Sequence, residues 1–362
     1  MRCVLLTLTF LSLQISLPAQ QNGPWNSPLR IASSSDGRTF APSVVFQDSA
    51  GVPSVTRWRG DTLICAFQWF REPRGTPTWD RVAVKYSYDD GATWSQPAPV
   101  VIRGLPLQYQ RPFDPTLVVV NGRLRMYFSS SDGMPMGGLT DIVNTYSAIS
   151  DDGVTYDFEP GARFDMSNKP VIDPAVIMFR AQWHFSAPIG APQEGAYHLV
   201  SNDGLLFQPR PPYPSDNTHN WTGNFVAVND TVLRFYGSGQ ALWYKQSSDA
   251  QSWGPFVATN VMGGDPSVVL TRNGRYLMVY VGPRYPTGIV HTEHQHAIVV
   301  GQQLVQIPFN PLGAEYELYG LAGNLLGRGV LESMYISTNS AAQPIVLRIR
   351  SYAHCYSTVV LP

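Results

Sequence analysis

The sequence predicts an all-β fold: a five-bladed β-propeller closed by an N-terminal hairpin, plus a small β-sandwich-like module at the C-terminus. Three observations predict it. A short turn motif recurs along the chain, strand-like runs alternate with it, and Gly (31) and Pro (30) are frequent without forming low-complexity tracts. Turn-forming residues spread through a whole chain are typical of many short strands.

The recurring motif reads Ser-x-Asp-Gly-x-x-aromatic, and its copies lie about 45 to 60 residues apart, the spacing of four-stranded propeller blades. Gly supplies the left-handed conformation that a tight turn needs, and the Asp carboxylate can accept hydrogen bonds from backbone N–H groups of its own turn. We therefore assign these Asp residues a structural role. The five copies are Ser33–Phe40, Tyr86–Trp94, Ile149–Tyr156, Val200–Phe207 and Gln246–Trp253.

A strand–turn–strand run forms the second repeat, and its β-branched and aromatic content suits strands buried between neighbouring sheets. The first turn motif has no such run before it, and the last run has no turn motif after it. The N-terminal hairpin is therefore predicted to complete the last blade, which removes exposed sheet edges. An open array of sheets is the alternative. The runs are Pro53–Phe67, Asp114–Phe128, Asp173–Phe185, Gly223–Tyr236 and Asp265–Tyr280.

The N-terminus has the pattern of a signal peptide over 1–19. Arg2 supplies the positive charge, Val4–Leu17 is apolar, and Leu17-Pro18-Ala19 offers a cleavage site. The alternative is an N-terminal strand or helix. No later segment is long and apolar enough to span a bilayer. The propeller is predicted over 20–300 and the linker and terminal module over 301–362.

Composition excludes some partners. The formal net charge is −1 and only 14% of residues are charged, which argues against nucleic acid as the main partner. The three Cys residues, Cys3, Cys65 and Cys355, lack metal-ligand spacing, and we predict no disulfide between Cys65 and Cys355. The sequence does not indicate an oligomeric state.

The C-terminal module combines the Asn-Pro linker in Ile307–Pro311, the strand–turn–strand run Tyr316–Gly329 and apolar final strands. It resembles the C-terminal sorting domain of type IX secretion substrates from Bacteroidetes-type bacteria. The resemblance implies that the secretion machinery is a partner and that the protein is secreted or held at the outer cell surface. An ordinary β-sandwich appended for binding is the alternative.

Aligning the five runs places Val52, Asp114, Asp173, Thr222 and Asp265 at equivalent strand starts, on one face of the ring. Three of these are Asp followed by Pro. This pattern resembles the five-bladed glycoside hydrolases, a group that includes arabinanases, xylosidases and invertases, and the turn motifs resemble the Asp-boxes of sialidases.

The hydrolase resemblance implies that acidic residues at strand starts do the chemistry with a Glu as the acid. We therefore take Asp114, Asp173 and Asp265 as candidate catalytic residues and Glu194 as the candidate acid. Val52 departs from the pattern, which expects Asp there. The structural alternative for the Asp-Pro pairs is that Asp caps the strand start and Pro fixes its backbone.

Other residues of the same face suit a sugar. Trp79, Tyr109 and Trp221 are predicted to stack on sugar faces, and Arg111 and Arg284 to bind hydroxyls or a carboxylate. We predict no cofactor and no metal ligand. A Ca²⁺ ion on the axis and a metal at His291–His296 are left open.

Carbohydrate is thus the predicted partner, and the predicted function is a glycan-processing propeller, a glycoside hydrolase if it is active. A non-catalytic propeller that binds glycan or protein is the alternative, supported by Val52. A sialidase ranks third because that class needs six blades.

Overall fold

The computed structural model describes residues 27–71, 73–76, 78–131, 143–166 and 169–283. Beyond these it describes 298–299, 304–306, 315–320, 325–330, 335–337, 345–350 and 355–360. The chain divides into two compact units, Met1–Pro283 and Arg284–Pro362. The predicted signal peptide, Arg284 and the His291–His296 cluster lie outside the described residues. Among the residues described, no helix has the length and apolar character to cross a membrane.

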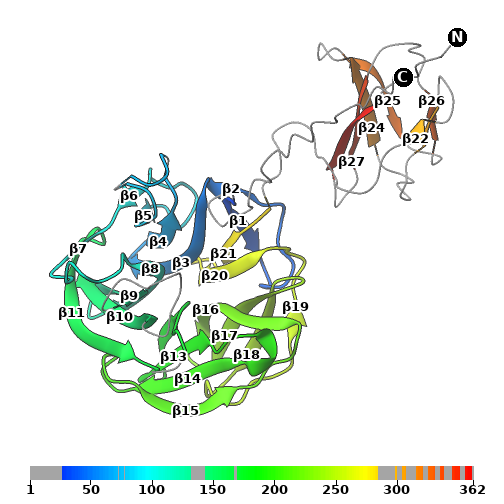
Figure 1. The fold of residues 1–362 in the computed structure, drawn as a ribbon. Helices are drawn as coiled ribbons and strands as arrows, with labels where there is room; N and C mark the ends of the chain where they lie inside the picture. Colours follow the sequence, from blue (N-terminus) through cyan, green and yellow to red (C-terminus); the bar gives the residue numbers. More distant parts are fainter. Residues whose placement is uncertain are drawn as a thin grey trace, which may run out of the picture. The chain divides into compact units, whose positions relative to one another are not determined.

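Five antiparallel sheets surround a common axis in the first unit, as Figure 1 shows. Blade one holds β3 (Ala50–Arg59), β4 (Thr62–Trp69), β5 (Arg81–Ser87) and β6 (Ala98–Pro99), and blade two holds β8 (Phe113–Val120), β9 (Arg123–Ser131), β10 (Val143–Ser150) and β11 (Thr155–Phe164). Blade three holds β12 (Ala175–Phe179), β13 (Gln182–Pro188), β14 (Ala196–Ser201) and β15 (Gln208–Tyr213), and blade four holds β16 (His219–Asn229), β17 (Val232–Gly239), β18 (Trp243–Ser247) and β19 (Val257–Ala258). The short β7 (Val101–Arg103) adds to β11 in parallel.

The fifth blade is built from both ends of the unit. β20 (Gly264–Leu270) and β21 (Tyr276–Val281) supply its inner strands, and β1 (Leu29–Ser34) and β2 (Val44–Gln47) complete it. β1 pairs with β21 along its whole length, from Leu29 opposite Val281 to Ser34 opposite Tyr276. The predicted five-bladed propeller closed by an N-terminal hairpin is confirmed, and backbone hydrogen bonds join the two ends of the ring.

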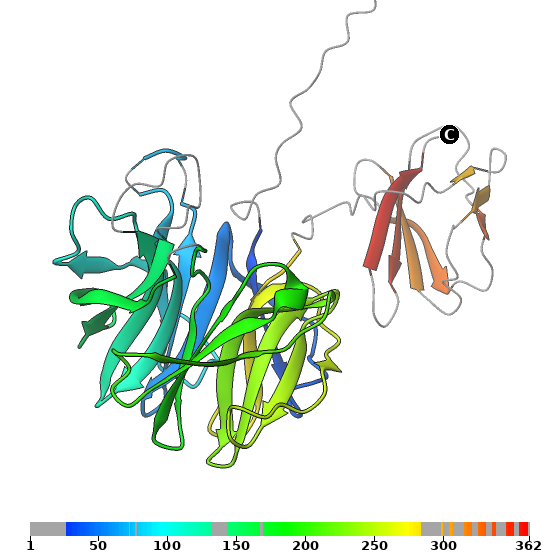
Figure 2. The ribbon, with the colours of Figure 1, turned by 60° about the horizontal axis from the view of Figure 1, so that its bottom comes forward.

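Each contact between neighbouring blades has its own apolar cluster. β4 shows why the strands are apolar nearly throughout. Leu63, Cys65 and Phe67 pack toward blade five, whereas the alternating residues Ile64 and Ala66 pack toward blade two. Because successive side chains of a strand point to opposite faces, a strand between two sheets must be apolar on both. Figure 2 shows these sheets side by side.

Four of the five turn motifs form the same hydrogen-bonded turn. The second has one extra residue and keeps the Ser87–Asp89 bond, but its Asp89 accepts from the Thr93 N–H instead. In the third motif, Ser150 Oγ donates to Asp152 Oδ1 at 3.0 Å, and Oδ1 accepts from the N–H groups of Val154 and Thr155 at 2.8 and 2.7 Å. Gly153 has φ +76°, which favours glycine. In the first motif, the backbone N–H groups of Thr39 and Arg38 lower the pKa of Asp36 to about 2. The turn carboxylates are thus held ionised by local bonds, as a structural role requires.

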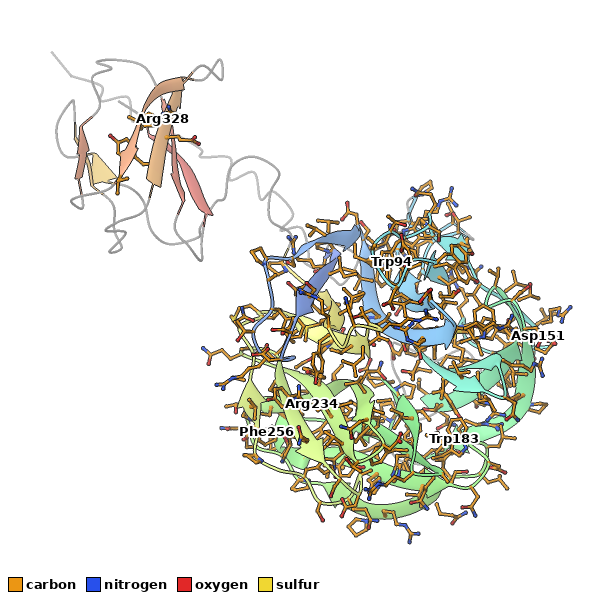
Figure 3. The ribbon with its side chains drawn as sticks, turned by 180° about the vertical axis from the view of Figure 1, so that it is seen from behind. Trp94, Asp151, Trp183, Arg234, Phe256 and Arg328 are labelled. Atoms are coloured by element: carbon orange, nitrogen blue, oxygen red, sulfur yellow. The ribbon has the colours of Figure 1, made fainter. Side chains whose placement is uncertain are left out.

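These turns also dock each blade on the preceding one. Tyr86 of blade one donates to the Asp152 carbonyl of blade two at 2.8 Å, and Tyr127 of blade two donates to the Gly204 carbonyl of blade three at 2.8 Å. Tyr236 of blade four donates to the Gly37 carbonyl of blade five at 2.8 Å. Figure 3 shows Trp183 of blade three and Arg234 of blade four from behind the ring.

The second unit contains two sheets. One has the strand order β25 (Leu325–Val330), β24 (Glu315–Gly320), β27 (Ile345–Arg350) and β28 (Cys355–Val360), and the other β22 (Ile298–Val299), β23 (Leu304–Gln306) and β26 (Tyr335–Ser337). β24 and β25 pair antiparallel across the predicted Gly turn, and the two final strands pair with each other. The described residues of this unit all lie in strands, as predicted.

Substituting a docked turn glycine tests this inter-blade contact. A Cβ on Gly204 would lie 2.8 Å from Tyr127 Oη and 2.9 Å from Trp183 Cδ2, at φ +71°. We expect Gly204→Ala to lower the free energy of unfolding by about 1–2 kcal/mol for the left-handed backbone and by about 1–3 kcal/mol more for the clash. Urea denaturation followed by tryptophan fluorescence measures the loss.

Gly122→Ala is the matched control, because Gly122 has φ +78° and nothing lies within 4 Å of its added Cβ. This variant should lose only the part of the free energy of unfolding that comes from the left-handed backbone. Equal losses in the two variants would contradict the docking role of the turn.

Candidate active site

Four of the five inner strands start at a residue in the left-handed region that precedes a proline. Asp114, Asp173 and Asp265 have φ of +50°, +52° and +47°, and each precedes a proline. Val52 has φ +45° and also precedes proline. In blades one, two and five the pairing register shifts at this point. Bulges re-aim side chains, and Asp tolerates the left-handed region better than most residues. The predicted alignment of strand starts thus corresponds to a common local structure in four blades.

Asp114 is the most enclosed of the three carboxyls. Its side chain lies on the inner strand of blade two and is 7% exposed. Oδ2 accepts from Ser129 Oγ at 3.0 Å and from the backbone N–H of Asp173 in blade three at 3.3 Å. Burial raises the pKa of Asp114 to about 7, and the charges of Asp265 and Asp80 also raise it, against the two hydrogen bonds. The carboxyl therefore titrates near neutrality.

Asp173 and Asp265 belong to the same electrostatic group. Burial raises the pKa of Asp173 well above its ordinary value, and the charges of Asp114 and Asp265 add to this. Burial raises the pKa of Asp265 to about 6. Carboxyls that repel one another in a shielded site share protons instead of ionising together. At neutral pH this group keeps at least one proton, the condition for a general acid.

A pocket of about 440 Å³ opens beside Asp114 and Asp173. Its walls come from the end of β4, the residue before β5, the segment before β8 and the segment before β12. The lining residues are Gln68, Asp80, Tyr109, Gln110, Arg111, Phe113, Asp114, Ile172 and Asp173. Of the sequence-predicted residues, Asp114, Asp173, Tyr109 and Arg111 are therefore brought together in one pocket, and Asp265 lies close enough for its charge to act on both carboxyls.

Asp80 is a pocket residue that the sequence reasoning missed. It precedes β5 with φ +55°, and its carboxylate accepts a hydrogen bond from Gln68. It lies in blade one, the blade in which Val52 replaces the expected strand-start Asp. The sequence did contain a signal for Asp80: it is an acidic residue next to Trp79, which was already predicted to lie on the substrate-binding face. The loop that carries it belongs to no repeat, so alignment of the blades could not find it.

Glu194 lies elsewhere. It ends the short 3-10 helix η2 (Pro192–Glu194) in blade three, where its Oε1 is 2.6 Å from Lys169 Nζ and its Oε2 accepts from the Ala191 N–H at 2.9 Å. The bond from Lys169 lowers the pKa of Glu194, and the Ala191 bond adds to this. Glu194 does not line the pocket. A carboxylate held ionised in this way is poorly suited to donate a proton.

Two predicted sugar-stacking rings are packed in the propeller core instead. Trp221 is 1% exposed and stacks on Tyr213 at a centroid distance of 4.9 Å, so it offers no face to a ligand. Trp79 is 9% exposed and packs on Phe70 at 5.7 Å. Both expectations are corrected, because burying a large apolar ring against other side chains is more favourable than leaving it exposed to solvent. Tyr109 does line the pocket, with its ring packed edge-on against Tyr146.

Gln110 adds an acceptor to the pocket wall. Its backbone is fixed at both ends, because its N–H donates to the Ser131 carbonyl and its carbonyl accepts from Ser130 Oγ. Its side-chain Oε1 is buried and accepts no hydrogen bond from the described part of the chain. Buried acceptors are nearly always satisfied, so this unpaired oxygen is unusual. Within the described ranges, no three His, Cys, Asp or Glu side chains group as metal ligands.

Comparisons with known proteins agree with the fold. No family model and no curated protein matches the sequence. The Bombyx mori GH32 β-fructofuranosidase is similar in structure, with a TM-score of 0.51 and 11% identity over 94% of this chain and 90% of that chain. A GH43_1 enzyme from Xanthomonas citri complexed with xylose gives a TM-score of 0.47 and 16% identity over 64% and 80%.

A family 117 glycoside hydrolase from Zobellia galactanivorans gives a TM-score of 0.45 and 14% identity over 60% and 73% of the two chains. At these identities the likeness to the silkworm enzyme supports the propeller fold alone. The ring of five blades does not provide the six that the sialidase hypothesis needs.

Removing a shielded carboxyl should stabilise the fold at high pH. A carboxyl whose pKa is raised on folding contributes stability below its ordinary pKa of 3.8, and this is lost as pH rises through the folded value of about 6. We expect Asp265→Asn to raise the free energy of unfolding at pH 8 by on the order of 1–3 kcal/mol, and to have little effect at pH 4. Urea denaturation at the two pH values measures both.

Asp157→Asn is the control, because Asp157 is exposed on an outer strand and pairs with Arg103 at 2.7 Å. It should not gain stability at pH 8. A loss of stability in Asp265→Asn at pH 8 would contradict the burial of an unfavourable charge.

Proposed function

We propose that this protein is a glycoside hydrolase whose active site is the pocket between blades one, two and three. The observation that carries the proposal is the group of shielded carboxyls at this pocket, with Asp114 titrating near 7. Glycoside hydrolysis needs two carboxyl groups in different protonation states on opposite sides of the scissile bond. A pocket lined by Tyr109 and Gln110 as well as by carboxyls suits a sugar ring and its hydroxyls.

The carboxyls take distinct roles in this proposal. Asp173 keeps its proton and donates it to the leaving-group oxygen, because burial and two neighbouring charges disfavour its ionised form. Asp80, held by Gln68, is the second carboxyl and acts as base or nucleophile in place of the carboxylate that blade one lacks. Asp114 lies on the inner strand of blade two, between blades one and three. Its carboxyl accepts a hydrogen bond from the Asp173 N–H, so it positions Asp173, and its charge raises the pKa of Asp173.

A non-catalytic glycan-binding propeller is the second candidate. It is favoured by Val52, which stands where the resemblance expects a carboxylate. Asp80 weakens this objection, since it supplies a carboxylate from the same blade.

Export is a further part of the proposal. The apolar stretch Val4–Leu17 and the cleavage pattern after it support secretion. The all-β C-terminal unit suits a sorting module, so we infer that the chain is released or held at the outer surface of a bacterium through type IX secretion. The turn motifs, with their Ser–Asp bonds, suit the Asp-box type of hairpin.

Hydrolysis of aryl glycosides and polysaccharides by the full-length protein tests the proposal. We expect cleavage of at least one substrate and a loss of about 10²–10⁴-fold in kcat/KM for Asp173→Asn, the range of a lost general acid. Asp157→Asn should retain full activity, because its exposed carboxylate pairs with Arg103 on an outer strand.

Circular dichroism of the Asp173→Asn variant separates lost chemistry from lost folding. If the folded variant stays active, the assignment of Asp173 is wrong. Tight glycan binding by the wild type without any cleavage would instead support the binding propeller.

A further inference from the structure

The pocket wall carries a guanidinium with no acidic partner. Arg111 lines the pocket, and its Nη1 donates to the Trp79 carbonyl at 2.7 Å. In the part of the chain that the structure describes, no carboxylate forms an ion pair with Arg111. The bond to a neutral carbonyl fixes one edge of the guanidinium and leaves its remaining N–H groups for a ligand.

A second guanidinium lies close to the first. Burial lowers the pKa of Arg81, and the positive charge of Arg111 lowers it further, against the charge of Asp80. Two guanidiniums near enough to repel each other therefore adjoin the pocket. The charge of Asp80 offsets part of this repulsion. Burial raises the pKa of the Asp114 and Asp173 carboxyls and so disfavours their charged forms. An anion bound at Arg111 would relieve this repulsion.

The position of Arg111 also suits an anion on the substrate. The backbone runs from Arg111 to Asp114 along the pocket wall, so the guanidinium and the proposed catalytic carboxyls face the same bound unit. Arginine presents parallel N–H donors that match carboxylate and sulfate oxygens.

We propose that the substrate is an acidic glycan, whose carboxylate or sulfate ester binds Arg111 in the sugar unit next to the cleaved bond, with Arg81 adding to the positive field. This inference rests on the proposed function and names its substrate class. A uronic acid and a sulfated sugar share the chemistry that Arg111 would recognise, so the experiment must distinguish them.

The test compares acidic glycans with neutral forms of the same chains. Polygalacturonate, glucuronoxylan and alginate are paired with their carboxyl-reduced forms, and chondroitin sulfate with both its desulfated and its carboxyl-reduced form. Cleavage rate and affinity are measured for the full-length protein. We expect at least one acidic glycan to be preferred over its neutral form about tenfold or more, the effect of one charge-assisted hydrogen bond. Comparison with the carboxyl-reduced and desulfated forms shows whether Arg111 binds a carboxylate or a sulfate ester.

Variants assign that preference to the residue. Arg111→Gln should bring the acidic and neutral forms within about threefold of each other, and Arg111→Lys should keep part of the preference. Arg71→Gln is the control, because Arg71 lies over Trp69 at 5.3 Å and does not line the pocket. It should leave the preference unchanged.

Three results would overturn the inference. Equal or faster cleavage of neutral forms removes the acidic substrate class but leaves the hydrolase standing. An acidic preference that survives Arg111→Gln removes the assignment to Arg111. Failure to bind or cleave any glycan removes this inference together with the proposed function, and it differs from the other two results because the wild type then cleaves neither acidic nor neutral forms.

Discussion

The left-handed residue before proline at the start of an inner strand is the constraint on which this site depends. Four blades keep it, with φ between +45° and +52°. Holding a non-glycine residue there costs on the order of 1–2 kcal/mol, and more for the β-branched Val52. Blade one, which has Val52 instead of a carboxylate, thus keeps the same backbone. The left-handed residue is therefore a feature of the propeller, and three blades use it to place an Asp near the axis.

Bringing three carboxyls together opposes folding, and the rest of the ring offsets that repulsion. Each blade contact buries its own apolar cluster, and the turn motifs dock each blade on its neighbour. The same residue type thus behaves in two ways. Asp36, exposed in its turn and bonded by backbone N–H groups, has a lowered pKa, whereas Asp173 at the axis has a raised one. Hydrogen bonds within the turn lower the pKa of Asp36, whereas desolvation raises the pKa of Asp173. Clustered buried carboxyls of this kind lower the stability of the folded state, a cost that active sites commonly carry.

Much of the fold follows from the repeats. The number of turn motifs predicts the number of blades, and the first motif, which has no strand pair before it, predicts how the ring closes. Both predictions were possible because the motifs depend on local residues that recur along the chain. The strand-start aspartates could be aligned for the same reason. Asp80 could not, because its place depends on a loop that occurs once. Trp221 and Glu194 were misjudged because their partners, Tyr213 in the core and Lys169 across a loop, are set by tertiary packing.

The central claim is that three aspartates from different blades form one proton-sharing group at the pocket. A carbon-13 NMR titration of the Asp carboxyl groups measures this without knowledge of the substrate, with resonances assigned by Asp→Asn variants. We expect Asp114 to titrate at about 7, Asp265 at about 6 and Asp173 well above the ordinary range. If all three titrate near 4, the ordinary value for a solvated Asp, they are neither shielded nor coupled, and the proposed acid loses its physical basis.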